Sequence, residues 1–264
     1  MMKYSAKLMF YAGYLMARVL IMGNAALINM SGVDSQDSYT LIEASSDYIV
    51  IDKSPGVNLH RNYAKQSLVD ILNADFPGIN LHLVHRLDDA TSGLLLLAKN
   101  PEAAAELGAL FANREIEKYY LALADGKPSK KQGSVVGDIK KSRSGSYLLS
   151  RTRSNPSVTQ FFSYSLGSGR RAYLLKPHTG KTHQLRVVMK SLGTAIIGDN
   201  RYGPTSQESD RMYLHATALR FRFRGEQRVY VSLPKFGELF ADGGLATALL
   251  DCQSPWALPW PSLN

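Results

Sequence analysis

The chain has 264 residues, of which 45% are hydrophobic and 20% charged, so it can bury one large core or two modest ones, and a low-complexity protein is excluded. Its formal net charge of +9 and isoelectric point of about 9.5 favour a polyanionic partner such as a nucleic acid. The single cysteine, Cys252, excludes an internal disulfide and a thiolate cluster for zinc or iron–sulfur, which favours a cytoplasmic protein.

The first thirty residues are apolar and rich in methionine, with Lys3, Lys7 and Arg18 as their only charges. A signal peptide or a membrane anchor can have this composition. However, Arg18 lies in the middle of the apolar stretch, where a charge is costly, and there is no clear cleavage site of small residues. We therefore expect no membrane segment. Residues 1–38 are interpreted as an N-terminal extension, either disordered or the product of a start assigned too early, with Met30 as the true first residue.

The predicted core elements begin after this extension. Residues 39–51 alternate and then become apolar, which predicts a strand that ends before a Lys-Ser-Pro-Gly turn at 53–56. A short helix is expected at 66–74, because its leucines and isoleucine recur on one face. Two apolar runs, at 81–87 and 94–98, have the length of buried strands.

A polar segment separates these two apolar runs and contains Arg86, Asp88, Asp89, Thr91 and Ser92. A charged loop held between core strands is a common place for chemistry, because the strands fix side chains that face solvent. Adjacent side chains on an extended segment point to opposite sides, so only one of the two aspartates is expected to enter a given pocket. Spacing alone does not decide which one.

A helix is expected to begin at Asn100 as its N-cap and Pro101 as its first residue. Its apolar stripe, Ala104, Leu107, Leu110 and Phe111, is interpreted as core. Strands are expected at 117–123, 158–164 and 171–175, followed by a hairpin pair at 221–223 and 229–231, and residues 232–264 are expected to wrap the domain.

Positive charge is concentrated between residues 114 and 190, where sixteen Lys or Arg stand against four acids. Within it, residues 128–156 are rich in Lys, Arg, Ser and Gly and offer little to bury, so exposed strands or hairpins and a mobile loop are expected. Lys140, Lys141 and Arg143 at its centre are predicted to contact a phosphate backbone. A solvated face or disorder without function is the alternative.

Three motifs together resemble the RluA-type pseudouridine synthases. The first is His85-Arg86-Leu87-Asp88, followed by Thr91-Ser92-Gly93 and a run of leucines, and the second is Lys118-x-Tyr120. The third, residues 179–186, reads Thr-Gly-Lys-Thr-His-Gln-Leu-Arg, where the family usually has Thr-Gly-Arg-Thr-His-Gln-Ile-Arg. Lys181 keeps the charge of that arginine but not its two-pronged contacts. The resemblance extends over about residues 39–233.

This resemblance implies a mixed α/β (α+β) fold, with one catalytic domain over residues 39–264 built on an extended, mainly antiparallel sheet flanked by helices and loops. RNA is expected in a basic cleft across the sheet. The implied reaction is isomerisation of specific uridines in a ribosomal or transfer RNA stem-loop, with the target base flipped out of its stack. The short segment before the domain leaves little room for the amino-terminal S4 RNA-binding module that many members have.

The resemblance also assigns site residues. Asp88 is the catalytic aspartate, as nucleophile or base; Arg186 pairs with it, and Tyr120 lies near the target base, to stack on it or assist proton removal. The residues expected to bind RNA are Arg86, Thr91, Lys118, Lys140, Lys141, Arg143, Lys181, His183 and Gln184. No metal or cofactor is expected, because the reaction has no redox step or net hydrolysis and the histidines show no metal-binding pair. The protein is expected to be a monomer.

Two interpretations from other classes remain open at this point. A metal-dependent phosphoesterase or nuclease could use His85, Asp88 and Asp89 as ligands, and a chelator would then abolish its activity. A noncatalytic RNA-binding protein could use the basic region alone, and replacing Asp88 by asparagine would then leave its function intact.

Overall fold

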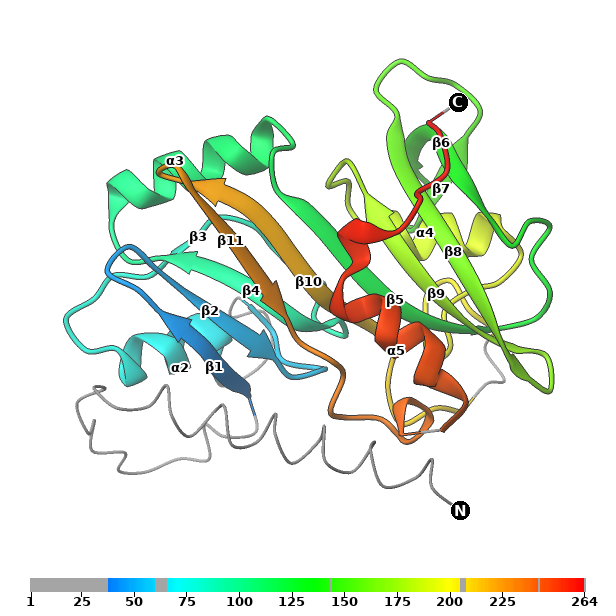
Figure 1. Cartoon of the computed structure of the whole chain (residues 1–264), viewed down its shortest axis with the longest axis horizontal. Helices are drawn as coiled ribbons and strands as arrows, with labels where there is room; N and C mark the ends of the chain where they lie inside the picture. Colours follow the sequence, from blue (N-terminus) through cyan, green and yellow to red (C-terminus); the bar gives the residue numbers. More distant parts are fainter. Residues whose placement is uncertain (1–37, 60–65, 143, 205–207, 242, 264) are drawn as a thin grey trace. The chain divides into compact units, whose positions relative to one another are not determined.

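The computed structural model describes residues 38–59, 66–142, 144–204, 208–241 and 243–263. Apart from Ser38, the predicted N-terminal extension lies outside these residues, as does Arg143. The strands are β1 (Tyr39–Ala44), β2 (Tyr48–Lys53), β3 (His82–Leu83), β4 (Ser92–Ala98), β5 (Glu117–Asp125), β6 (Gln132–Lys141), β7 (Tyr147–Ser150), β8 (Ser157–Gly167), β9 (Arg170–Pro177), β10 (Leu214–Phe223) and β11 (Glu226–Val231). The α-helices are α2 (Leu68–Asp75), α3 (Pro101–Ala112), α4 (Gln184–Ser191) and α5 (Ala246–Gln253), and short 3₁₀ turns lie at Glu238–Phe240, Gly243–Leu245 and Pro255–Ala257 (Figure 1).

All the described strands belong to one sheet, in the order β1-β2-β4-β10-β5-β9-β8-β6-β7, with β3 beside β4 and β11 beside β10. Among these strands, β4 and β10 run parallel and the other neighbours run antiparallel. This arrangement confirms the expected mixed fold with a mainly antiparallel sheet. In this order a single strand, β10, separates β4 from β5. The segment before β4 therefore lies near β5, although the two are far apart in sequence.

The expected strand at 81–87 is wrong over most of its length, since β3 contains His82 and Leu83 alone. Beyond β3 the backbone no longer pairs with β4. Instead, the side chain of His85 accepts a hydrogen bond from the backbone N–H of Leu96 at 2.9 Å, a group that a neighbouring strand would otherwise bind. The chain is thereby released from the sheet to form the loop that contains Asp88.

Helices cover both faces of β2 and β4. Tyr48, Val50, Leu94 and Leu96 pack with Ala103 and Leu107 of α3. The alternate residues, Ile49, Ile51, Leu95 and Leu97, pack with Leu68 and Leu72 of α2. A strand that is buried on both faces needs a continuous apolar run, which explains the sequence of β4. The N-cap prediction for α3 is confirmed, because the side chain of Asn100 accepts from Ala103 N at 2.8 Å.

The other half of the sheet is covered by α4 and α5. Leu185 and Met189 of α4, and Ala248 and Cys252 of α5, belong to the same core as Tyr119 and Tyr173 on the strands. The predicted basic hairpin is confirmed as β6–β7, and β7 pairs with β6 at the edge of the sheet. The C-terminal segment therefore closes a core, as expected for residues that wrap the domain.

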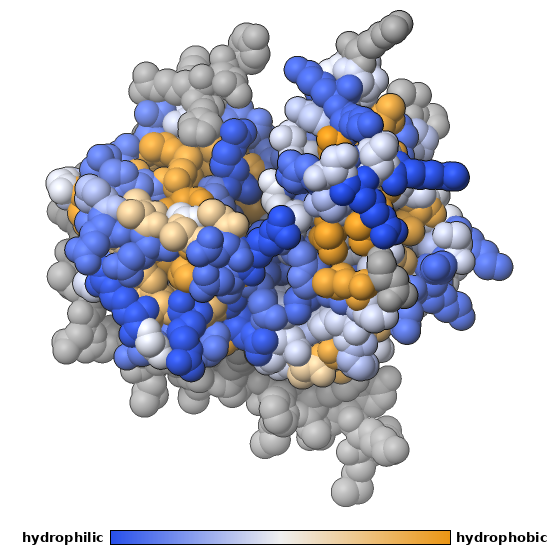
Figure 2. Space-filling view, turned by 90° about the horizontal axis from the view of Figure 1, so that it is seen from above, coloured by the Kyte–Doolittle hydropathy of each residue, from blue (hydrophilic) through white to orange (hydrophobic). Residues whose placement is uncertain are grey.

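The surface seen from above is mostly hydrophilic, with apolar side chains gathered in separate patches (Figure 2). This mixture is ordinary for a protein surface. Within the described residues, none of the helices has the length and apolar character needed to cross a membrane.

Candidate active site

The loop that contains Asp88 leaves β3, turns, and enters β4. Its turn is closed by a hydrogen bond from Thr91 N to Asp88 O at 2.9 Å. Two residues later, Gly93 has a φ of 109° and lies so close to β10 that a Cβ there would be 2.3 Å from Ala216 O. A glycine is therefore required at this position, and it lets β4 approach β10 directly behind the loop.

Lys53 holds the other side of this loop. Its ammonium group is fully buried and donates to the carbonyl oxygens of Ser54 at 2.9 Å, Val57 at 3.1 Å and Asp89 at 2.9 Å. Gly56 N also donates to Asp89 O, at 2.9 Å. Burial lowers the pKa of Lys53 to about 7. Through Asp89, the turn at the end of β2 fixes the backbone next to Asp88.

The side chain of Asp88 pairs with Arg186, in the first turn of α4: Nη1 of Arg186 donates to Oδ2 of Asp88 at 3.2 Å. The same guanidinium donates from Nε and Nη2 to both carboxylate oxygens of Asp199, at 2.8 Å each. The Asp199 carboxylate is fully buried, whereas that of Asp88 is 30% exposed. Arg186 is therefore anchored in the interior and presents its remaining nitrogen to the exposed aspartate.

The Asp199 carboxylate is held in place by the backbone that follows it. Its Oδ1 also accepts the backbone N–H groups of Arg201 at 3.0 Å and Tyr202 at 3.1 Å. Burial would raise the pKa of Asp199, but hydrogen bonds and the charge of Arg186 outweigh it and hold that pKa below its ordinary value. Asp199 is consequently an anion that keeps Arg186 in place.

Tyr120 lies across the cleft on β5. Tyr119 is fully buried in the core, while Tyr120 is partly exposed and lines the cleft, as the alternation of a strand requires. Burial, and then the charge of Asp88, raise the pKa of Tyr120 well above its ordinary value. The phenol therefore stays protonated near neutral pH and offers a flat ring and a hydroxyl donor.

The turn before α4 is fixed by Gln184. Its Oε1 accepts from Thr179 Oγ1 at 2.7 Å and Lys181 N at 3.0 Å, and its Nε2 donates to Val158 O at 3.2 Å and Thr159 Oγ1 at 2.9 Å. The amide is thus engaged by the protein and supports the turn; its contact with RNA stays a prediction. Lys181 donates to Asn155 Oδ1 at 2.7 Å, which fixes its ammonium group at the rim.

His183 precedes α4 in a left-handed conformation, with a φ of 53°. Its Nδ1 is 2.8 Å from the hydroxyl of Tyr202, and that hydroxyl accepts from Tyr147 N at 3.0 Å. Because the hydroxyl accepts from the backbone, its own proton is free to be donated to Nδ1. In the tautomer in which Nδ1 accepts that proton, Nε2 of His183 carries the ring proton and is an N–H donor.

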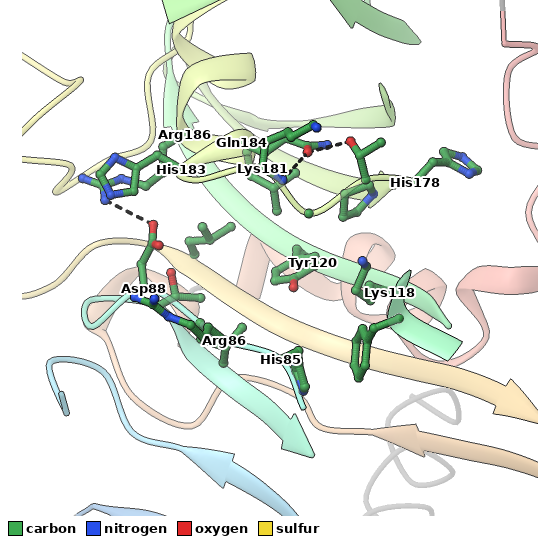
Figure 3. A pocket seen from close by; sticks show the side chains of 18 of the residues that line it. His85, Arg86, Asp88, Lys118, Tyr120, His178, Lys181, His183, Gln184 and Arg186 are labelled. Atoms are coloured by element: carbon green, nitrogen blue, oxygen red, sulfur yellow. Dashed lines mark hydrogen bonds and ion pairs between the residues drawn. The ribbon is translucent and has the colours of Figure 1, made fainter. Parts of the chain in front are cut away.

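A cleft of about 820 Å³ lies between the loop of Asp88, β5 and the turn before α4, and Asp88, Tyr120, Lys181, His183, Gln184 and Arg186 are among the residues that line it (Figure 3). A second hollow of about 540 Å³ adjoins it and is lined by Asp88 and Asp89 together with Asn200 and Arg201. Asp88 borders both hollows and Asp89 borders the second alone. The expectation that only one aspartate enters a given pocket therefore holds for the larger cleft and is wrong for the second hollow, which both aspartates line. Among the residues described as lining the larger cleft, one carboxylate, Asp88, faces five cations: Arg86, Arg114, Lys118, Lys181 and Arg186.

Most of the predicted RNA-binding residues meet in this cleft: Arg86, Thr91, Lys118, Lys181, His183 and Gln184. Lys140 and Lys141 do not, since they lie at the exposed end of β6 and border neither hollow. Arg143 is outside the described residues. Any contact of the hairpin with RNA would therefore lie outside the cleft.

Sequence reasoning missed several residues of this site. Asp199 stood in a Gly-Asp pair that reads as a turn, and its spacing of thirteen residues from Arg186 gives no periodic signal. Phe111 was interpreted as core but is partly buried and lines the cleft, because it lies in the last turn of α3. Within the described part of the chain, no group of three or more His, Cys, Asp or Glu is placed to hold a metal.

Comparison with known proteins agrees with this geometry. Residues 47–191, more than half of the chain, match the family model described as RNA pseudouridylate synthase. A Haemophilus influenzae protein named uncharacterized RNA pseudouridine synthase is 47% identical over 195 residues, which are 74% of this chain and 87% of that protein.

A Rickettsia bellii protein named ribosomal large subunit pseudouridine synthase C is 37% identical over 186 residues, which are 67% of this chain but 61% of that longer protein. Among solved structures, human RNA pseudouridylate synthase domain containing 1 superposes with a TM-score of 0.68 and 28% identity. The match includes 88% of this chain and 100% of the human chain. The likeness therefore includes the fold, and the residues that match the family model include the loop of Asp88, β5 and the turn before α4.

Proposed function

Because the chain belongs to the RNA pseudouridylate synthase family, whose members isomerise uridine in RNA, we propose that Asp88 is its catalytic carboxylate. The observation that supports this most is the pair of Asp88 with Arg186, at one end of a cleft whose other lining charges are positive. A carboxylate in this position meets the reacting sugar while the cations meet the RNA backbone.

The reaction breaks the bond between N1 of uracil and C1′ of ribose, turns the base, and joins C5 to the same C1′. The proton on C5 is lost and N1 gains one, so atoms and charge balance without an external reactant. A carboxylate suits this chemistry, because bond cleavage leaves an electron-poor C1′ that an anion can attack or stabilise, and because it can accept a proton. Arg186 orients the Asp88 carboxylate through its hydrogen bond and places a positive charge beside it.

Tyr120 is proposed to stack on the target uracil. Its ring faces the cleft beside Asp88, and its raised pKa keeps the hydroxyl protonated, so the side chain supplies an aromatic face and a hydrogen-bond donor. Base–aromatic stacking tolerates the rotation of the uracil, because each orientation presents the same flat surface.

The target uridine must leave its stack to reach Asp88, and single-stranded loops are the cheapest source of such a nucleotide. We therefore propose a stem-loop as substrate. Large-subunit ribosomal RNA is the first RNA to test, because a relative is named for it, and transfer RNA is the alternative. We further propose a cytoplasmic monomer that needs no metal or cofactor, since the isomerisation has no redox step and no net hydrolysis.

The proposal is tested with purified protein and unmodified transcripts of large-subunit ribosomal RNA and of transfer RNAs. Wild-type protein should form pseudouridine at a defined site in the presence of a chelator, and Asp88→Asn should bind the same RNA without converting it. Equal conversion by Asp88→Asn would assign the catalytic role to another residue. Cleavage of the transcripts that the chelator abolishes, without pseudouridine formation, would favour the phosphoesterase interpretation.

A further inference from the structure

The cleft does not end at the target-base position. It continues along β5 from Tyr120 to Lys118, two residues earlier on the same face of the strand, and is bounded there by Phe111, Arg114 and His178. In the close view, Asp88 and Arg186 lie to one side of Tyr120, and Lys118 and His178 to the other (Figure 3). A uracil held between Asp88 and Tyr120 would leave this far end of the cleft free.

The charges at the two ends of the cleft are balanced differently. At the near end, Arg186 is neutralised by Asp88 and Asp199. At the far end, neither Arg114 nor Lys118 forms an ion pair with any carboxylate in the described part of the chain. Burial, and then the charge of Arg114, lower the pKa of Lys118. Two neighbouring cations without a counter-charge form a site that attracts an anion.

An aromatic wall adjoins these two cations. His85 and Phe111 stack with ring centroids 4.4 Å apart and an interplanar angle of 23°, and Lys118 Nζ lies 5.7 Å from the centroid of Phe111. Burial lowers the pKa of His85 to about 3, so the ring is neutral and adds no charge. A wall of uncharged rings excludes water and strengthens the interaction of Lys118 with an anion.

The backbone at Arg114 gives a second, independent observation. Helix α3 ends in a Schellman motif, in which Arg114 N donates to Phe111 O at 3.2 Å and Glu115 N to Leu110 O at 2.9 Å. The residue at the left-handed position of this motif is usually glycine, but here Arg114 adopts a φ of 64°. Glycine would adopt this left-handed conformation without strain, whereas arginine adopts it at a cost in conformational free energy.

Arg224 is a second arginine with a left-handed backbone, and its ion pairs give it a structural role. It also has a positive φ, of 47°, yet its guanidinium pairs with Asp47, Glu102 and Glu106 on the neighbouring elements. Arg114 makes no comparable contact in the described part of the chain and borders the cleft instead. Arg114 therefore lacks a structural role of the kind that Arg224 has, and its side chain can meet a ligand in the cleft.

We propose that Arg114 and Lys118 form a second phosphate-binding subsite, which takes the backbone phosphate of a nucleotide next to the flipped uridine. The inference rests on the proposed function for the identity of the ligand as RNA. A planar guanidinium binds two phosphate oxygens at once, and the lysine supplies a point charge from the floor of the cleft. Anchoring the neighbouring phosphate fixes the register of the strand and brings the correct uridine to Asp88.

The test uses Arg114→Gly, because this change removes the cation and relieves the left-handed strain together. A labelled synthetic RNA stem-loop with uridines in its loop serves as the probe, and its affinity is measured over a range of salt concentrations. Arg114→Gly should weaken binding by about tenfold at low salt. It should also make the negative slope of log K against log salt, where K is the association constant, less steep by about 0.7. Its thermal midpoint should equal or exceed that of the wild type.

Three further variants make the result specific. Arg114→Lys should have a salt slope close to that of the wild type. Arg114→Asn, whose asparagine also tolerates the left-handed conformation, should have the same salt slope as Arg114→Gly. Arg224→Gly removes a cation from the same backbone geometry away from the cleft and should leave the slope unchanged. Unchanged binding by Arg114→Gly, or equal losses in Arg114→Gly and Arg224→Gly, would overturn the subsite.

Failure of the subsite and failure of the proposed function give different results. If the wild type converts uridine but the slope of Arg114→Gly is unchanged, the second subsite alone is wrong. If the wild type converts no uridine in any RNA, the proposed function is wrong, whatever the slopes show.

Discussion

Arg186 and Asp199 form a two-pronged ion pair, with both hydrogen bonds at 2.8 Å, and the same guanidinium reaches Asp88 at 3.2 Å. The buried carboxylate therefore sets the position of the arginine, and the arginine sets the position of the exposed carboxylate. This order follows from the accessibility of the groups, since the Asp199 carboxylate is fully buried and that of Asp88 is not.

Asp199→Asn is expected to lower kcat by tenfold or more with a smaller change in KM, because Arg186 loses the charge that fixes it. Removing one partner of a buried ion pair should also cost about 3 kcal/mol in the free energy of unfolding. Steady-state kinetics and chemical denaturation measure the two effects. Wild-type kcat in Asp199→Asn would show that Asp88 does not depend on this support.

The stability difference between wild type and Asp199→Asn should also depend on pH. The folded-state pKa of Asp199 lies below its ordinary value, so its carboxylate stabilises the fold above the unfolded pKa of about 4. That contribution is lost as pH falls through the lower, folded-state pKa. The difference should be largest at neutral pH and shrink below about pH 4, and a constant difference would contradict this ion pair.

Lys53→Met is expected to loosen the loop of Asp88, because three carbonyl oxygens, among them Asp89 O, each lose the hydrogen bond from the lysine ammonium group. The free energy of unfolding should fall by about 2 kcal/mol, and kcat should fall with it. Lys235→Met is the control, since that lysine is half-exposed and its ion pair with Asp52 contributes little. Equal effects of the two variants would argue against a role for Lys53 in the loop.

Tyr120→Phe is expected to keep RNA affinity within about twofold, while Tyr120→Ala should weaken it by tenfold or more, because the ring supplies the stacking surface. Since the pKa of Tyr120 is raised, its hydroxyl should cause no break in the rate profile between about pH 6 and pH 9. Tyr119→Phe, on the opposite face of β5, is the binding control. Equal affinities of the phenylalanine and alanine variants at position 120 would rule out stacking.

Replacing Lys140, Lys141 and Arg143 by alanine is expected to weaken RNA binding and to reduce the magnitude of its salt slope by about 2, which is about 0.7 for each of the three lost phosphate contacts. Because Lys140 and Lys141 lie outside the cleft, kcat at saturating RNA should stay near the wild-type value. Arg228→Ala, which removes a partly exposed cation on β11, is the comparison. Unchanged affinity at every salt concentration would remove the hairpin from the RNA footprint.

The local motifs made much of this fold and site predictable. The Asn-Pro start of α3, the alternation in β5 and the apolar run of β4 each specify a short-range structure. The expected contact of Arg186 with Asp88 came from the family resemblance, and the structure contains it. The catalytic roles of these residues and of Tyr120 stay predictions.

What escaped prediction depends on contacts between distant segments. His85 was expected in a strand, but its ring takes the N–H of Leu96 and releases the chain from the sheet. Phe111 was expected in the core; it packs against that core as a half-buried residue and also borders the cleft, which was not expected. Lys53 reaches a carbonyl thirty-six residues away, and the conformation of Arg114 depends on where α3 ends. No periodicity in the sequence encodes these relationships.

The most direct test of the catalytic assignment is pseudouridine mapping on ribosomal and transfer RNA from cells that lack this gene, complemented with wild type or with Asp88→Asn. We expect one or more sites to disappear in the absence of the gene, to return with wild type, and to stay absent with Asp88→Asn, although the variant still binds RNA. Restoration of the same sites by Asp88→Asn would contradict the central role of this carboxylate.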